Sequence, residues 1–184
     1  MLGRDRLFRI GVTHRVEIRY ETPEDHASVR HVHQQAFGQS DEANLVERLR
    51  AANKAPIALV ATLNGQVVGH VLFSPVVLEP AQTHFKAVGL APVGVLPEYQ
   101  KQGIGSRLIR EGLEACRDPG YGAVVVLGDP AYYSRFGFSR ARDHGLSNEY
   151  HANEHFMVTA LREGVLDGVS GMLKYQPEFQ EVNP

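Results

Sequence analysis

Along most of the chain, hydrophobic residues either alternate with polar ones or recur at helical spacing, and these two periods predict the order of the elements. The alternating run at residues 16–20 predicts a strand with one buried face. Apolar positions three and four apart then predict a helix that starts after Thr22-Pro23 and a second helix from Asp41. One strand followed by a pair of helices is therefore expected at this end of the domain.

A hairpin is predicted near the middle of the chain. Apolar runs at residues 57–63 and 66–73 flank Asn64-Gly65, the pair of residues most typical of a two-residue hairpin turn. We expect two antiparallel central strands here. The mixed segment 74–85 contains two prolines and is expected to form a loop or a frayed hairpin end.

The apolar run at residues 86–95 predicts a further strand, although it contains Pro92. Proline has no N–H to donate, so a buried strand tolerates it only at a bulge or along an unpaired edge. Alternatively, the proline only precedes a short strand that begins at Val93. Two apolar runs near the end of the chain, 156–161 and 171–175, predict the last two strands.

A helix with a strong apolar face is predicted from Ile104, and it begins at a glycine-rich turn. Residues 100–106 read Gln-Lys-Gln-Gly-Ile-Gly-Ser. Two glycines allow close approach to a ligand, and the unpaired N–H groups and positive dipole of a helix start favour an anion. The dinucleotide fingerprint does not fit, because Leu108 stands at its third glycine, and no Walker A loop is present. The pattern indicates either a pyrophosphate site or an ordinary strand-to-helix turn.

A second landmark follows the apolar run at residues 123–127. Residues 129–138 read Asp-Pro-Ala-Tyr-Tyr-Ser-Arg-Phe-Gly-Phe. With Gln-x-x-Gly-x-Gly at 100–105, the segment from Gly89 to Phe138 resembles the GCN5-related N-acetyltransferase (GNAT) superfamily, and most of all its bacterial YhbS-type members. The order and spacing of these landmarks are more specific than either motif alone.

This resemblance implies an α/β (α+β) fold in a single domain. The expected sheet is mixed and mostly antiparallel, with about seven strands, a V-shaped splay between the fourth and fifth strands, and about four flanking helices. The GNAT domain is expected to span residues 16–184, after an N-terminal extension at residues 1–15. In the family, the pantetheine arm of the cosubstrate fills the splay by pairing with the exposed strand, and the two early helices wall the acceptor pocket.

The resemblance also implies direct acetyl transfer from acetyl-CoA to a primary amine within one ternary complex. Tyr133 stands at the position of the family's general acid, which protonates the CoA thiolate. The sequence does not assign the general base. Glu79, His84 and His70 are weak candidates, and a chain of water molecules is an alternative to all three. The residues expected to bind the cofactor are Val93, Gly94, Val95, Gln100, Lys101, Gln102, Gly103, Ile104, Gly105, Ser106, Tyr133 and Phe136.

Two other function classes stay open. The first is a non-catalytic acyl-CoA-binding or regulatory module of the same fold, against which Tyr133 argues because a sensor does not need an acid at the sulfur. The second is a small nucleotide-phosphate binder, which would need a nucleotide-specific acid or metal ligands. The acceptor itself is not identified by the sequence.

Composition narrows the partners and the compartment. With 19 basic and 21 acidic residues in a chain of 184, the protein lacks the basic excess of a general nucleic-acid or membrane binder. The single cysteine, Cys116, excludes an internal disulfide and lies on the apolar face of the predicted helix, so we interpret it as a core residue. His151 and His155 have helical spacing but no third ligand, so no metal is expected. We expect a cytoplasmic enzyme without a membrane span, and a homodimer is left open.

Overall fold

The computed structural model describes residues 15–181. The extension expected at residues 1–15 therefore lies almost wholly outside the described part. The four α-helices of the described part are α1 (His26–Phe37), α2 (Asp41–Ala51), α3 (Ile104–Ala115) and α4 (Pro130–Tyr133). Its nine strands are β1 (Glu17–Tyr20), β2 (Ile57–Leu63), β3 (Gln66–Glu79), β4 (Ala87–Val95), β5 (Ala123–Leu127), β6 (Ser139–Arg140), β7 (Leu146–Asn148), β8 (Phe156–Ala160) and β9 (Gly171–Lys174).

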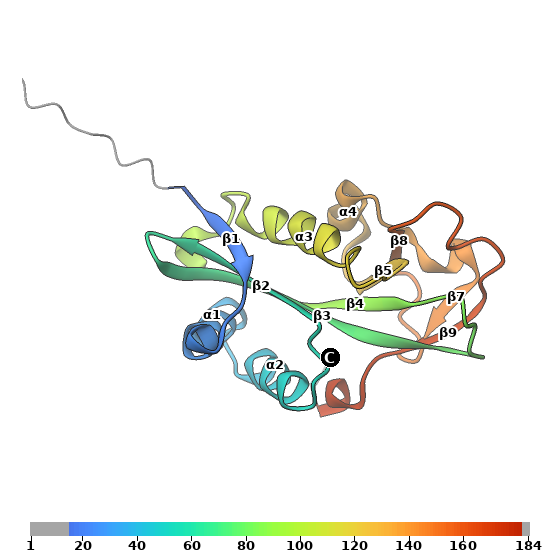
Figure 1. The fold of residues 1–184 in the computed structure, drawn as a ribbon, viewed down its shortest axis with the longest axis horizontal. Coiled ribbons are helices and arrows are strands. Elements are labelled where there is room, and N and C mark those ends of the chain that lie inside the picture. The colour runs from blue at the N-terminus through green and yellow to red at the C-terminus, as the bar shows by residue number, and fades with distance from the viewer. Residues whose placement is uncertain (1–14, 182–184) are drawn as a thin grey trace, which may run out of the picture.

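The strands form one mixed sheet in the order β1-β2-β3-β4-β5-β8-β6, with β9 beside the end of β3 and β7 beside β9. Neighbouring strands along the main path are antiparallel except β4 and β5, which are parallel. Helix α3 covers one face of this sheet, and α1 and α2 cover the other (Figure 1). The predicted fold class is confirmed.

The middle hairpin forms as predicted. Asn64 and Gly65 both have positive φ, +51° and +80°, which is the backbone that a two-residue hairpin turn with matching twist requires. Strand β3, however, continues to Glu79, so the loop or frayed hairpin end expected from residue 74 is wrong for residues 74–79. The sheet tolerates Pro75 because its missing N–H falls on the side of the gap between β2, which pairs as far as Phe73, and β9, which pairs from Val77. In that gap the Gln176 side chain donates to the carbonyl of Pro75 at 2.7 Å.

The sheet of the described residues has nine strands, two more than the number of about seven that was expected. The additional strands β6 and β7 have only two and three residues and lie in the polar stretch that follows Phe138. Strands this short are too short to show an alternation of hydrophobic and polar residues. Each forms by pairing with a longer strand, β6 with β8 and β7 with β9.

A bulge in β4 shapes the part of the sheet that matters for function. Between the pairs Val71–Val93 and Phe73–Leu90, β3 advances by two residues and β4 by three, so β4 holds an extra residue around Pro92. Strand β4 pairs with β5 only at its first three residues, from Ala87 to Gly89. Beyond that point, residues 90–95 have no strand on this side among the described residues. The predicted bulge and splay are therefore both present.

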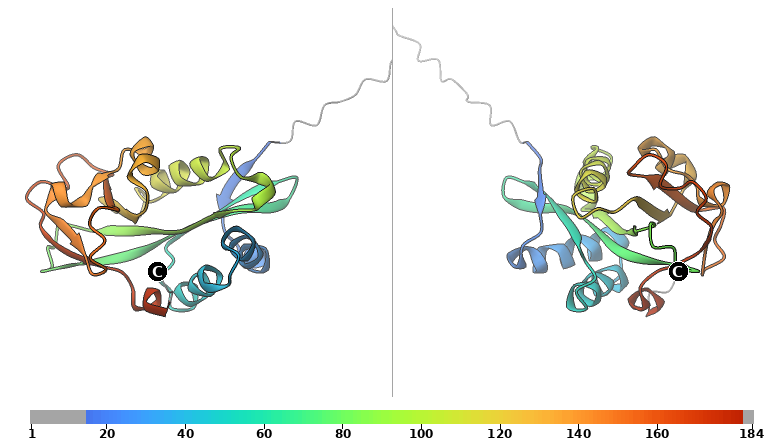
Figure 2. Two further views of the ribbon diagram at one scale, coloured as in Figure 1. Left: turned by 180° about the vertical axis from the view of Figure 1, so that it is seen from behind. Right: turned by 45° about the vertical axis from the view of Figure 1, so that its right-hand side comes forward.

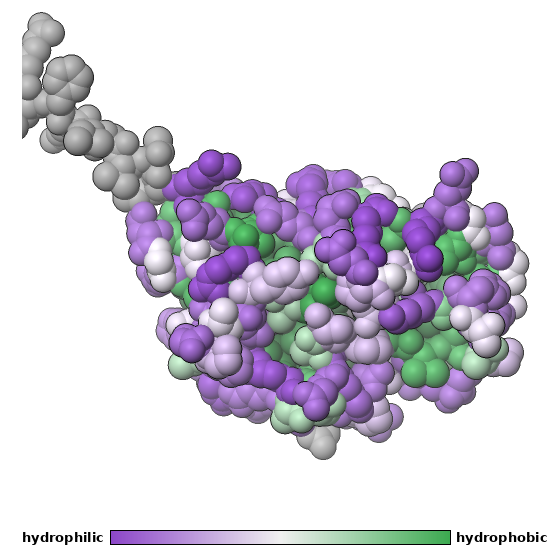
Figure 3. All heavy atoms as spheres, viewed as in Figure 1, coloured by the Kyte–Doolittle hydropathy of each residue, from purple (hydrophilic) through white to green (hydrophobic). Residues whose placement is uncertain are grey.

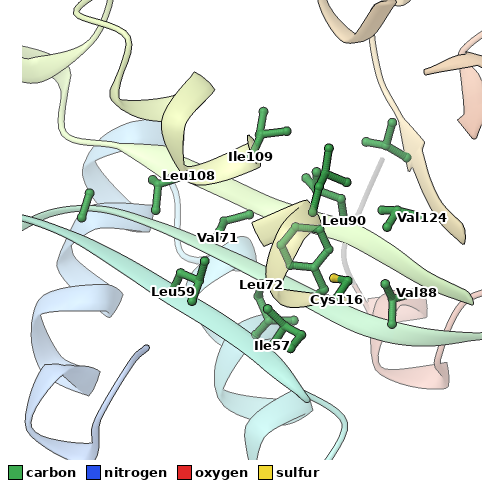
Figure 4. Packing of buried hydrophobic residues seen from close by; sticks show 14 of the residues in the cluster. Ile57, Leu59, Val71, Leu72, Val88, Leu90, Leu108, Ile109, Cys116 and Val124 are labelled. Carbon is green, nitrogen blue, oxygen red and sulfur yellow. The ribbon is translucent and has the colours of Figure 1, made fainter. Parts of the chain in front are cut away.

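One hydrophobic cluster spans the sheet and both helical layers, and a second lies around β5, β7, β8 and β9. Side chains from β2, β3 and β4 meet Leu108 and Ile109 of α3 and Cys116 just after it, all fully buried (Figure 4). Burial raises the pKa of the Cys116 thiol to about 12, so Cys116 is an inert core residue, as predicted. The two further views show the same layers from behind and from the side (Figure 2). On the face seen in Figure 3, hydrophilic side chains dominate and hydrophobic ones show in recesses between them.

Helix α3 approaches the sheet closely at Gly112. A Cβ atom there would lie 2.5 Å from Cζ of Phe73, whose ring is fully buried. Alanine normally stabilises a helix interior by about 1 kcal/mol over glycine, but overpacking a core costs about 1–3 kcal/mol. We therefore predict that Gly112→Ala lowers the free energy of unfolding by about 1 kcal/mol, the middle of the difference between these two terms, measured by urea denaturation.

The cause of that loss can be tested by a double-mutant cycle. Phe73→Leu removes the ring, so Gly112→Ala should cost nothing or be stabilising in that background. An unchanged or higher stability of Gly112→Ala in the wild-type background would show that the ring can move aside.

Candidate active site

A cleft of about 500 Å³ opens where β4 separates from β5 and α3 begins. Two of its lining residues, Lys101 and Arg135, carry a full charge, and both are cations. No carboxylate lines it within residues 15–181. The cleft is lined by Val93, Gly94, Val95, Tyr99, Gln100, Lys101, Gly103, Ile104, Gly105, Ser106, Tyr132 and Arg135. This composition suits an anionic ligand.

The floor of the cleft is the turn that leads into α3. Lys101 and Gly103 both take the left-handed backbone, with φ of +59° and +81°, so the chain turns sharply before the helix starts at Ile104. The first N–H groups of a helix have no partner within it, and here they face the cleft together with the positive end of the helix dipole. The turn thus provides what a phosphate group requires.

The side of the cleft is the unpaired edge of β4. Its backbone from Val93 to Val95 borders the cleft, and Gln100 donates to the carbonyl of Val95 at 2.9 Å. Backbone groups without a strand partner are strong hydrogen-bonding groups that an extended ligand can satisfy as an added strand.

The opposite wall comes from α4 and the turn after it. Arg135 lies over the ring of Tyr132, with Cζ 4.3 Å from the ring centroid, and both side chains line the cleft. The sequence analysis did not assign Tyr132, Arg135 or Tyr99 to the site. The spacing along the short helix was the signal that could have found the first two. Residues three apart lie on the same face of a helix, so Tyr132, and not the adjacent Tyr133, shares a face with Arg135.

Three residues predicted to bind the cofactor do not line this cleft. Gln102 points back and donates to the carbonyl of Glu98 at 3.1 Å. Phe136 borders a different hollow beside α3, and Tyr133 lines a second cavity. The other nine predicted residues come together around the cleft.

The second cavity, of about 370 Å³, adjoins the cleft through a shared residue, Val93. It lies on the side of α1 and α2, and its lining is apolar except for Glu42 and the phenol of Tyr133. The lining residues are Phe37, Glu42, Leu45, Leu90, Ala91, Pro92, Val93, Val126, Leu127, Tyr133 and Phe179.

Tyr133 is held firmly in this cavity wall. Its ring lies against the backbone of Gly128, where any Cβ atom would collide with it, and packs edge-on against Phe138 with centroids 5.7 Å apart. Burial, helped by the neighbouring Tyr132, raises the pKa of Tyr133 to about 12. Within the described part of the chain the hydroxyl has no hydrogen-bond partner, so a ligand can receive its proton as a hydrogen bond.

None of the three candidate bases lines either cavity. Glu79 ends β3 at the far end of the sheet and pairs with Lys174 at 2.6 Å, and His84 is exposed in the following loop. His70 is fully buried under α1. The sequence could not separate these positions, because each depends on how far β3 extends and which of its faces is covered.

His70 belongs to a buried polar chain beneath β4. Its Nδ1 lies 2.8 Å from Nε2 of His33, and its Nε2 lies 3.8 Å from Glu21, which also pairs with Arg50. Burial lowers the pKa of His33 to about 3, with smaller contributions from His70 and Arg50. Burial also lowers the pKa of His70, against the opposing effect of Glu21. Both rings are therefore neutral at physiological pH.

This buried chain supports the strand that borders the cleft. His70 pairs directly with Gly94 across the β3–β4 ladder, and the His33 ring fills the space that a side chain on Gly94 would need, with Nδ1 3.0 Å from the position of a Cβ atom. The glycine thus lets α1 approach β4 closely.

Comparison with known proteins agrees with this geometry. The model of the acetyltransferase (GNAT) domain family matches residues 17–141. The uncharacterized N-acetyltransferase YhbS of Escherichia coli K12 is 40% identical over 164 residues, which are 88% of this chain and 97% of YhbS.

Two solved structures extend the agreement to the fold. The crystal structure of E. coli YhbS in complex with CoA superposes with a TM-score of 0.87 at 39% identity and covers 92% of this chain and 94% of that one. A GNAT family acetyltransferase from Brucella melitensis in complex with acetyl-CoA has a TM-score of 0.75 at 38% identity, over 90% and 99% of the two chains. The chain belongs to the GNAT acetyltransferase family, so the resemblance found in the sequence is confirmed.

No helix within the described residues is long and apolar enough to cross a membrane.

Gly105 offers a direct test of the cleft. A Cβ atom there would meet only Val95 and the Tyr132 hydroxyl, at 3.7 and 3.8 Å, so the unliganded fold accepts a side chain. We predict that Gly105→Glu lowers CoA affinity at least tenfold, about 1.4 kcal/mol, because it places a carboxylate where phosphates would bind. Isothermal titration with CoA measures this, and the melting temperature should stay unchanged.

A matched variant separates the local effect from the change in net charge. Ala51→Glu adds the same charge at an exposed position on α2, on the opposite face of the sheet, and should leave CoA affinity unchanged. Equal affinities of Gly105→Glu and wild type would show that the phosphates bind elsewhere.

Proposed function

We propose that this protein is an acetyl-CoA-dependent N-acetyltransferase that moves the acetyl group directly to a primary amine in a ternary complex. The observation that carries the proposal is the meeting of two cavities at Val93, one lined by cations and the other by a carboxylate and apolar groups. A reaction between an anionic cosubstrate and an amine needs two such compartments joined at the reacting atoms.

Acetyl-CoA occupies the first cleft in this proposal. Its pyrophosphate lies at the start of α3 between Lys101 and Arg135, and its pantetheine arm pairs with the edge of β4 as an added strand. The thioester then reaches Val93. The complexes of the two relatives with CoA and acetyl-CoA support this assignment.

The acceptor amine occupies the second cavity, walled by α1 and α2. Its nitrogen attacks the thioester carbonyl carbon, the carbon–sulfur bond breaks, and CoA leaves as a thiolate. Backbone groups at Val93 and Val95 hold the carbonyl and pantetheine. Since none of the candidate bases borders either cavity, we assign removal of the amine's proton to a chain of water molecules.

Tyr133 assists the leaving thiolate mainly as a hydrogen-bond donor. A thiol has a reference pKa of about 8.5, and the phenol of Tyr133 has a pKa of about 12. Complete proton transfer to the thiolate would therefore be uphill by roughly 5 kcal/mol, whereas a donated hydrogen bond has no such cost.

We predict that Tyr133→Phe lowers kcat by about 10²-fold while CoA affinity changes little, because only the leaving thiolate needs the hydroxyl. Steady-state rates beside CoA titrations measure the two effects. Tyr121→Phe is the matched control, since Tyr121 is equally buried but lies before β5 and outside both cavities. Equal kcat values for Tyr133→Phe and wild type would assign Tyr133 to packing alone.

The proposed function itself is tested by a thiol-release assay with acetyl-CoA and a panel of primary amines. We expect amine-dependent CoA release with acetylated amine as the second product. Tight acetyl-CoA binding without release for any amine would instead favour a non-catalytic acyl-CoA-binding module.

A further inference from the structure

The acceptor cavity has an unusual balance of charge. Among its described lining residues, Glu42 alone carries a full charge at neutral pH, and no lysine, arginine or histidine is present. The adjoining cleft has the opposite balance, with two cations and no carboxylate. The two compartments therefore differ in the sign of the ligand that each attracts.

Glu42 has unused hydrogen-bonding capacity. It lies in the first turn of α2, partly buried, and within residues 15–181 its two carboxylate oxygens accept only long contacts from the Gln39 amide, at 3.3 and 3.4 Å. A carboxylate has about four acceptor sites, so most of them face the cavity and solvent. A primary ammonium, with three donors, is the complementary group.

Apart from Glu42 and the phenol of Tyr133, the wall is apolar, and its residues come from six separate elements. Phe37 at the end of α1 is 42% exposed, which is unusual for so large an apolar side chain, and it lies at this cavity. Phe179, from the short 3-10 helix at Pro177–Glu181, lies on the same cavity. The volume of about 370 Å³ corresponds to about a dozen water-sized groups of ~30 Å³ each.

This lining discriminates against several kinds of amine. A free amino acid would bring a carboxylate for which the described wall has no cation. A polyamine would bring further ammonium groups into apolar surroundings beyond the reach of one carboxylate. Burying such unpaired charges is costly, so both classes should bind poorly.

Building on the proposed function, we propose that the acceptor is a small monoamine with an apolar body, whose ammonium is bound by Glu42 and whose body packs against Phe37, Leu45 and Phe179. The charge of the ammonium is matched by the carboxylate, and the body removes exposed apolar surface from water. The acetylated product is neutral, so it loses the contact with Glu42 and leaves more readily.

Four amines with different combinations of charge and apolar body test the class. 2-Phenylethylamine has an apolar body and one charge, ethylamine lacks the body, phenylalanine adds a carboxylate, and spermidine adds further cations. We expect kcat/KM for 2-phenylethylamine to exceed that of each of the other three at least tenfold, as differences of this kind produce in other specific sites.

A pair of variants tests Glu42. Glu42→Gln keeps the shape but removes the charge, and should raise KM for 2-phenylethylamine at least fivefold while CoA affinity stays unchanged. Glu47→Gln is the control, because Glu47 is on the same helix, pairs with Arg30 at 2.9 Å and does not line the cavity. It should leave KM unchanged.

The outcomes separate this inference from the proposed function. Equal or faster turnover of phenylalanine, spermidine or ethylamine would overturn the apolar monoamine while the release of CoA still supported acetyl transfer. An unchanged KM in Glu42→Gln would overturn the role of Glu42. Bound acetyl-CoA with no release for any amine would overturn the proposed function and this inference together.

Discussion

Strand β4 pairs with β3 along its whole length but with β5 over only three residues. Both cavities exist because β4 and β5 separate beyond those three residues. The extra residue at Pro92 bends β4, since a proline cannot donate to a ladder and a bulge turns the strand. The edge that results offers unpaired backbone groups in the middle of the strand order, between β4 and β5. Such an edge would be a liability on the surface, and here it becomes the place where an extended ligand can complete the ladder.

The elements on the two sides of this opening give it opposite electrostatics. On one side, the start of α3 supplies unpaired N–H groups and a positive dipole end beside Lys101 and Arg135. On the other side, α2 begins with Glu42 beside apolar side chains. The charged side chains of both cavities lie at the start of a helix or in a short turn, not on a long loop. The rigid sheet between the two cavities therefore fixes the distance between the cations and the carboxylate.

The strand that borders the cleft is supported from below by buried polar groups. Glu21, His70 and His33 form a chain from the residue after β1 through β3 to α1, and Arg50 balances the carboxylate. Removal of either histidine would leave the facing ring nitrogen of the other buried without its partner, which costs more than the bond itself contributes. Gly94 is required for this packing, because the His33 ring occupies the place of its side chain.

The sequence alone determined the features that depend on neighbouring residues: the turn at Asn64-Gly65, the glycine-rich turn at the start of α3 and the spacing that singles out Tyr133. These signals are local, since backbone conformation and helix starts follow from a few adjacent side chains. Only the tertiary structure decided that Tyr132 rather than Tyr133 lines the cleft at the start of α3, that Glu42 borders the second cavity, and that His70 is buried away from both cavities. These outcomes depend on which faces of distant elements pack together, and a side chain's neighbours across a sheet or between helices are fixed by the whole core rather than by its own stretch of sequence.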